Sequence, residues 1–170
     1  MPTIQHLLAI DPGFHQSACV EYNTSTGEIE THVFLPNEEM RGYLENAALV
    51  ERDRDSGLVV EMFEARGMPI GQESVETVFW AGRFLEIWAQ RYFPVYKMTR
   101  RDIKIHLFGT TRGVNDAVVR QLLIDRYGPE KQVALGTKKN PGPLYGLNGH
   151  ERDALALAIA WWETTGKSVL

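Results

Sequence analysis

The chain has 170 residues, of which 44% are hydrophobic and 24% are charged, and its formal net charge is −4. These proportions are ordinary for a soluble globular protein. No apolar run reaches the roughly 18 residues that a membrane-spanning helix needs, and the single cysteine, Cys19, excludes an internal disulfide and a zinc site of cysteine type.

The N-terminal part of the sequence predicts a meander of three strands. Residues 6–11, 17–22 and 29–35 are the expected strands. The Pro12-Gly13 pair ends the first of them, and the sequence NTSTG after the second is a hairpin turn. Cys19 lies in the second strand and is expected to be a small core residue.

The middle of the chain predicts alternating helices and strands. A helix over residues 38–52 follows Asn37, its expected N-cap. Residues 58–63 form a strand that is apolar on both sides of its pleat, which indicates a central place in the sheet. A helix over residues 72–91 and a strand over residues 93–98 complete this part.

The C-terminal part predicts two helices separated by a long loop. Asn115 is the expected cap of a helix that ends near Tyr127, and the last helix covers residues 150–163. Residues 128–149 contain several glycines and prolines, which predicts a mobile, functional loop. The element order indicates one α/β domain over residues 1–170, in which a three-strand antiparallel meander and two parallel strands form a mixed five-stranded sheet with helices on both faces.

Three acidic residues stand beside apolar segments. Asp11 ends LLAID, Glu61 follows LVV in the expected central strand, and Asp153 precedes ALALAIAWW. A carboxylate in such a place is costly unless it is paired or binds a metal ion. His150 lies three residues before Asp153 and therefore shares its helix face. If folding brings these groups together, they form a divalent-cation site of the kind used in phosphate chemistry.

Most of these residues also have a simpler explanation. Asp11 before Pro12-Gly13 could serve only to make a turn, Asp153 could stabilise a helix N-terminus, and His150 could be a surface residue. Glu61 is harder to explain in that way, because an unpaired carboxylate in a central strand is costly or stays protonated.

Charge is distributed unevenly along the chain. Residues 1–90 hold 5 Lys or Arg against 15 Asp or Glu, whereas residues 91–170 hold 13 against 7. This asymmetry permits a basic face that binds nucleic-acid phosphates in spite of the negative total. Two solvated surfaces without a partner would have the same composition.

The motifs AIDPG, VVE and HERDALALA, in this order and at these separations, resemble the RuvC family of Holliday junction resolvases, within the RNase H-like superfold. The similarity is greater to the phage-encoded branch than to the bacterial one, and it covers nearly the whole chain. The segment DIKIHLFGTTRGVNDAVVRQLL is similar to the family's segment of a lysine, a glycine-rich turn and a helix. AIDPG alone is a weak signal, because actin-like ATPases have similar strand ends.

The resemblance implies a role for five residues. Asp11, Glu61 and Asp153 would bind metal, His150 would be a fourth catalytic residue, and Lys104 matches a basic residue that approaches the scissile phosphate. Two Mg²⁺ or Mn²⁺ ions about 4 Å apart suit phosphodiester hydrolysis. We expect Asp11 to be shared by both ions, whereas His150 could either bind metal or position the attacking water.

The sequence departs from the bacterial pattern in two places. A second lysine of the glycine-rich turn is replaced, and the nearby cation is Arg112. The bacterial aromatic three residues after the catalytic glutamate is also missing, because Phe63 stands two residues after Glu61 and Glu64 occupies the third position. Strict sequence specificity is therefore not carried over from the family.

Several cations and aromatic residues are candidates for contact with DNA. The basic candidates are Arg100, Arg101, Lys104, Arg112, Arg120, Lys138 and Lys139. Phe63, Met68 and Tyr145 could act as wedges or stack on bases, although such residues more often pack within the protein.

The expected helix over residues 72–91 has two apolar stripes. One contains Val75, Val78, Phe79, Gly82, Leu85 and Ala89, and the other contains Trp80, Phe84, Ile87 and Trp88. One stripe can face the sheet, and the other then needs a helix of the same chain or a second subunit. We expect a homodimer through Trp80, Phe84 and Trp88, because a two-fold dimer suits paired cleavage of a four-way junction.

These observations predict a cytoplasmic, metal-dependent endodeoxyribonuclease that cleaves four-way or other branched DNA. The alternatives are an RNase H-like nuclease that acts on RNA or flaps, and an inactive junction-binding protein with the same fold. The intact acidic triad argues against inactivity. The chain is too short for the two domains of an actin-like ATPase.

Overall fold

A computed structural model describes residues 4–50, 55–91 and 93–166 of the chain. It confirms the expected mixed sheet, whose five strands lie in the order β3-β2-β1-β4-β5. The strands are β1 (His6–Asp11), β2 (Gln16–Asn23), β3 (Ile29–Pro36), β4 (Ser56–Met62) and β5 (Val95–Thr99). The first three form the antiparallel meander, and β4 and β5 continue from β1 in parallel.

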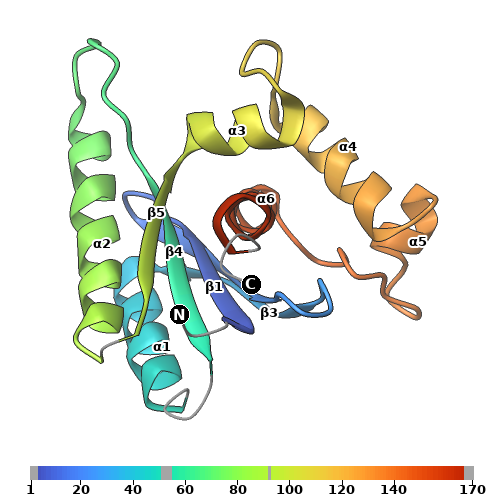
Figure 1. The fold of residues 1–170 in the computed structure, drawn as a ribbon, viewed down its shortest axis with the longest axis horizontal. Coiled ribbons are helices and arrows are strands. Elements are labelled where there is room, and N and C mark those ends of the chain that lie inside the picture. The colour runs from blue at the N-terminus through green and yellow to red at the C-terminus, as the bar shows by residue number, and fades with distance from the viewer. Residues whose placement is uncertain (1–3, 51–54, 92, 167–170) are drawn as a thin grey trace.

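Helices cover both faces of this sheet (Figure 1). Helices α1 (Asn37–Val50) and α2 (Gln72–Ala89) pack on one face, over Leu8, Ile10 and Val60. Helix α6 (Gly149–Trp161) crosses the other face and packs against Leu7, Ala9 and Val59. Alternate residues of β1 and β4 thus belong to two separate cores, as the two-sided apolar pattern of these strands predicts. Cys19 is buried in the core under α1 and α2.

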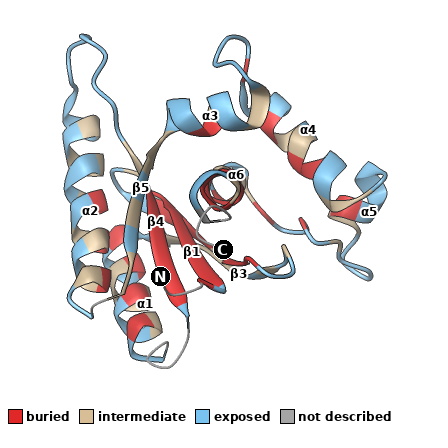
Figure 2. Ribbon diagram, in the orientation of Figure 1, coloured by how far each residue is buried: buried red, intermediate tan, exposed pale blue. Residues whose placement is uncertain are grey.

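Four further elements follow β5 or α6 in the chain. They are α3 (Arg100–Phe108), α4 (Asp116–Tyr127), α5 (Lys131–Leu135) and a π-helical turn, η2 (Trp162–Gly166), that continues α6. Helices α3, α4 and α5 form an arc around the outer side of α6 (Figure 1). Residues of α6 from Ala154 to Trp161 are all buried, and the four alanines among them let the helix approach the sheet closely (Figure 2).

Two helices were not predicted from the sequence. Helix α3 begins after Thr99, whose hydroxyl accepts a hydrogen bond from the Asp102 amide. It ends at Gly109, which adopts the left-handed conformation. The expected loop over residues 128–149 contains α5 and an isolated bridge between Gly136 and Pro141. The expected helix over residues 38–52 begins one residue earlier, and its last two residues lie outside the described part of the chain.

The apolar stripe of α2 that was expected at a dimer interface faces the core instead. Phe84 and Trp88 are fully buried against α1 and the sheet, and Trp80 packs at the edge of the same core. The predicted dimer interface through Trp80, Phe84 and Trp88 is therefore wrong. The exposed side of the helix carries Val75 and Phe79, because the larger aromatic side chains bury more apolar area when they face inward. Within the described residues, no helix combines the length and the apolar character needed to cross a bilayer.

Candidate active site

The sheet brings Asp11 and Glu61 together. The parallel register pairs Ile10 of β1 with Val60 of β4, so the two carboxylates are the next residues on adjacent strands. Asp11 stands two residues after Ala9 and Glu61 two residues after Val59, and both of these belong to the core under α6, so the two carboxylates point to the face that α6 covers. The Asp11 side chain is 9% exposed and the Glu61 side chain is 14% exposed, which places both at the inner wall of the site.

A buried polar network fixes the turn that follows Asp11. The Ser17 hydroxyl donates to Asn37 Oδ1 at 2.7 Å, and Asn37 Nδ2 donates to the Gly13 carbonyl at 2.9 Å. A side chain at Gly13 would place its Cβ 2.3 Å from the Gln16 carbonyl oxygen, so only glycine fits there. Asn37 was expected to cap α1, but it is the first helical residue and its side chain holds this turn instead.

Helix α6 supplies the other two expected site residues. Its first turn is fixed by a capping box, in which Asn148 and Glu151 exchange side chain-to-backbone hydrogen bonds. His32 of β3 adds a 2.8 Å contact to the buried Glu151 carboxylate. The start of α6 is therefore held to the sheet, and with it the positions of His150 and Asp153.

Three of the expected ligands lie in one cluster. Asp11, His150 and Asp153 each offer one ligand atom, and these atoms lie within 4.8 Å of one another. His150 Nδ1 is 3.0 Å from Asp11 Oδ2, and the imidazole stacks on Phe34 with ring centroids 5.2 Å apart. Carboxylate oxygens and an imidazole nitrogen at this spacing fit a divalent cation such as Mg²⁺ or Mn²⁺.

Arg100 joins Glu61 to this cluster. Its Nε lies 3.1 Å from Glu61 Oε1, and its Nη2 lies 2.5 Å from Asp153 Oδ2. The sequence placed Arg100 among the DNA-binding cations, and its position among the carboxylates was missed. Nothing in the sequence distinguishes it from its neighbour Arg101, because the pairing depends on where α3 begins relative to α6.

The closeness of the carboxylates changes their protonation. Burial and the neighbouring charge of Asp11 raise the pKa of Glu61 to about 7, although Arg100 opposes the shift. Burial also raises the pKa of Asp153. The hydrogen bond to Asp11 raises the pKa of His150, in spite of partial burial. Burial and close charged neighbours thus shift the pKa values of several groups at one place, which is typical of functional sites.

A groove of about 650 Å³ opens beside Glu61. Phe63 and Met68 line it from the segment after β4, and Arg101 and Lys104 line it from α3. Lys104 Nζ also donates to the Val114 carbonyl at 2.8 Å, which ties α3 to the turn before α4. Phe63 is 43% exposed and can therefore contact a ligand in the groove.

The other candidate cations, Arg112, Arg120, Lys138 and Lys139, are not among the residues that line this groove. Arg112 is exposed in the turn between α3 and α4. Lys138 and Lys139 are exposed after α5, which lies at the far end of α4 from α3 (Figure 1). The structure thus divides the expected DNA contacts into a group at the acidic site and a group along the outer arc.

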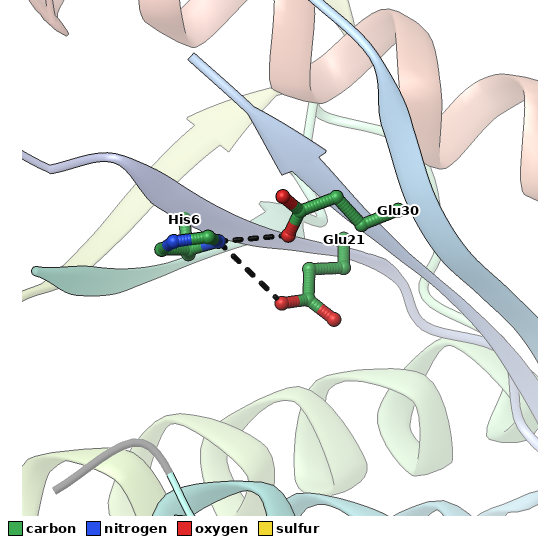
Figure 3. Close-up of side chains that lie close together, drawn as sticks. All are labelled: His6, Glu21 and Glu30. Carbon is green, nitrogen blue, oxygen red and sulfur yellow. Dashed lines mark hydrogen bonds and ion pairs between the residues drawn. The ribbon is translucent and has the colours of Figure 1, made fainter. Parts of the chain in front are cut away.

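A second cluster of titratable side chains occupies the other end of β1. Figure 3 shows the His6 ring facing both Glu30 and Glu21. The same nitrogen, Nδ1, lies 2.7 Å from Glu30 and 3.8 Å from Glu21. Asn23 Nδ2 also donates to Glu30. Burial would raise the pKa of Glu30, but the bonds from Asn23 and His6 hold it below its ordinary value. These contacts link the three strands of the meander where they leave the core.

Comparisons with known proteins identify the fold. No protein-family model matches the sequence, and no curated protein matches it. The Thermus thermophilus RuvC structure matches with a TM-score of 0.64 and 20% identity, over 95% of this chain and 96% of that one. The structure of T. thermophilus RuvC in complex with Holliday junction substrate matches with a TM-score of 0.59 and 21% identity, over 92% of each chain. The yeast mitochondrial Holliday junction resolvase Ydc2 matches with a TM-score of 0.55 and 11% identity, over 99% of this chain and 82% of that one. The fold is that of the RuvC-like resolvases, as the sequence motifs indicated.

Proposed function

We propose that this protein is a structure-selective endonuclease that hydrolyses DNA phosphodiesters at four-way or other branched junctions. The observation that carries the proposal is the meeting of Asp11, Glu61 and Asp153 with His150 at one end of the sheet in a RuvC-like fold. A RuvC structure with this fold has been solved with a Holliday junction substrate, which supports branched DNA as the partner.

The side chains at this end of the sheet suit two divalent cations, Mg²⁺ or Mn²⁺. Asp11, His150 and Asp153 would hold one ion, and Glu61 and Asp11 would hold the other. Bound there, the two ions supply an activated water and neutralise the charge that develops on the phosphate. The closeness of the three carboxylates supports this assignment, because added positive charge relieves their mutual repulsion.

The protein's own side chains orient the reacting groups. The alternative role for His150 leaves it without a metal ion: its Nδ1 keeps the bond to Asp11, its side chain is 63% exposed, and Nε2 can accept a proton from water at the mouth of the site. Lys104 lines the same groove as Glu61 and is held in place by the Val114 carbonyl. It can therefore bind the scissile phosphate without losing its orientation.

Labelled DNA substrates test the proposal directly. Four-way, three-way, flap and linear duplex DNA are incubated with the protein, with Mg²⁺ and with EDTA. We expect paired nicks in the four-way junction, with 5′-phosphate and 3′-hydroxyl ends, only when Mg²⁺ is present. Equal cleavage of linear duplex, or cleavage in EDTA, would contradict the proposal.

Replacement of Lys104 by alanine is expected to slow cleavage of bound junction about tenfold or more, because one charge that stabilises the reacting phosphate is lost. Replacement of Lys138, which is remote from the carboxylates, should chiefly weaken binding and reduce its salt dependence by about one released counterion. Single-turnover cleavage at saturating protein and a salt series of binding constants separate the two effects. If both substitutions affect only binding, Lys104 has no catalytic role.

The exposed side of α2 is our candidate for self-association. Val75, Val78 and Phe79 are 51%, 40% and 54% exposed and lie on adjacent turns of the helix. Two copies that pair through these side chains around a two-fold axis would present two acidic sites to one junction. We therefore expect light scattering to give about twice the 19.3 kDa chain mass.

Phe79→Glu is expected to convert such a dimer to a monomer without unfolding it. Val133→Glu is the matched control, since Val133 is also 51% exposed but lies on α5. A wild-type protein that stays monomeric at tens of micromolar would contradict dimer formation.

A further inference from the structure

Arg100 occupies a position that a metal ion would compete for. It is the first residue of α3, and its guanidinium spans two carboxylates from separate elements, Glu61 of β4 and Asp153 of α6. Both carboxylates are assigned to metal binding in the proposed function. An arginine keeps its charge at all ordinary pH values, so it can stop neutralising them only by moving away.

The position of Arg100 is not explained by the helix that carries it. A positive side chain in the first turn of a helix is opposed by the helix dipole, which makes that end partially positive. The next residue, Arg101, is likewise exposed and lines the same groove, but Glu61 and Asp153 form their ion pairs with Arg100. The pairing with Glu61 and Asp153 therefore holds the Arg100 side chain in the site.

The Arg100 side chain can also move away from the two carboxylates, because it is exposed and borders the groove. Arg100 is 47% exposed, whereas Glu61 is 14% exposed and Asp153 is 18% exposed, so the guanidinium closes the solvent side of the cluster. Arg100 lines the same groove as Arg101 and Lys104, where the phosphates of a bound DNA strand would lie. Phosphate oxygens accept the same paired hydrogen bonds from arginine as a carboxylate does.

We infer that Arg100 is an internal cation that competes with the divalent metal for Glu61 and Asp153, and that it moves to a DNA phosphate when the metal binds. This inference rests on the proposed function. It means that the metal and the DNA bind with positive cooperativity, because DNA gives the displaced guanidinium a new partner. By thermodynamic linkage, the metal strengthens DNA binding by the same factor.

Calorimetric titration with Mn²⁺ in the absence of DNA tests the competition. The proteins are wild type, Arg100→Gln and the control Arg101→Gln, which removes the same charge one residue away. We expect Arg100→Gln to bind Mn²⁺ about tenfold more tightly than wild type, the effect of removing two partly exposed ion pairs. Arg101→Gln should bind Mn²⁺ as wild type does. Arg100→Lys, which keeps the charge but loses the planar fork, should fall between them.

Thermal melts supply a second measurement and confirm that the variants fold. In EDTA, Arg100→Gln should melt below wild type, and saturating Mn²⁺ should raise its melting temperature by more than it raises that of wild type. Equal Mn²⁺ affinities for wild type and Arg100→Gln would overturn the inference, as would an equal gain from Arg101→Gln.

The titration of Asp153→Asn separates this failure from that of the proposed function. If wild type binds Mn²⁺ and Asp153→Asn does not, the metal site stands even when Arg100 proves irrelevant. If wild type binds no Mn²⁺, both the metal site and the competition are wrong.

Discussion

Glu61→Gln is expected to lower the cleavage rate of four-way junctions at least about a hundredfold, while the binding of junction DNA stays close to that of wild type. Glutamine has nearly the same shape as glutamate, so the strand and the core under α6 are preserved. Only the negative charge that would hold a cation beside Asp11 is removed. Cleavage is measured at saturating protein with Mg²⁺, and binding is measured by fluorescence anisotropy in EDTA.

Glu64→Gln is the matched control for this substitution. Glu64 also lines the groove, but it does not belong to the carboxylate cluster. Its Oε2 accepts a hydrogen bond from Arg66 Nε at 3.1 Å. The Glu64→Gln variant should cleave four-way junctions at close to the wild-type rate. Near-wild-type cleavage by Glu61→Gln would remove Glu61 from the metal site, and equal losses from both substitutions would point to a general effect on the groove.

The metal-free protein is expected to lose stability as the pH rises from 5.5 to 8. Glu61 has a folded-state pKa of about 7, above its ordinary value of 4.5, so within this window the folded state binds more protons than the unfolded state. Stability therefore falls with rising pH, by about 2 kcal/mol for this group alone. The raised pKa values of Asp153 and His150 act in the same direction.

Urea unfolding in EDTA at pH 5.5 and pH 8 measures this effect, and Glu61→Gln isolates it. The variant should show a pH dependence that is smaller by about 2 kcal/mol. Glu30 and Glu163 have lowered pKa values and stay ionised throughout this range, so they do not contribute. In Mg²⁺ the slope should reverse, because the metal binds the deprotonated ligands. Identical slopes for wild type and Glu61→Gln would show that Glu61 titrates normally.

The fold could be read from the sequence because its signals are local. Strand β1 is a continuous apolar run that ends at Pro12-Gly13, and α6 has both an Asn148 cap and a long apolar segment. The motifs around Asp11, Glu61 and Asp153 added the order in which strands and helix must meet. Helix α3 was missed because its N-cap, Thr99, is also the last residue of β5, which leaves no loop to mark the change.

The parts of the site that the sequence did not predict depend on tertiary contacts. A helical wheel shows that α2 has two apolar stripes, but the choice of the inward one depends on how Phe84 and Trp88 fit against α1. Arg100 belongs to a run of similar cations, and only the docking of α3 beside α6 separates it from Arg101. The role of Asn37 likewise appears only when β2 brings Ser17 beside it.

The long separation between Asp11 and Asp153 has a consequence for the synthesis of the protein. The five strands and helices α1 and α2 emerge from the ribosome before α6 does, whereas domains generally fold as units. Helix α6 supplies much of the core on its face of the sheet, and with it His150 and Asp153, and it is synthesised after all five strands. A nascent or prematurely terminated chain therefore lacks both the ligands and the helix that would hold them. The proposed nuclease becomes able to cut DNA only once α6 has been synthesised and has packed on the sheet.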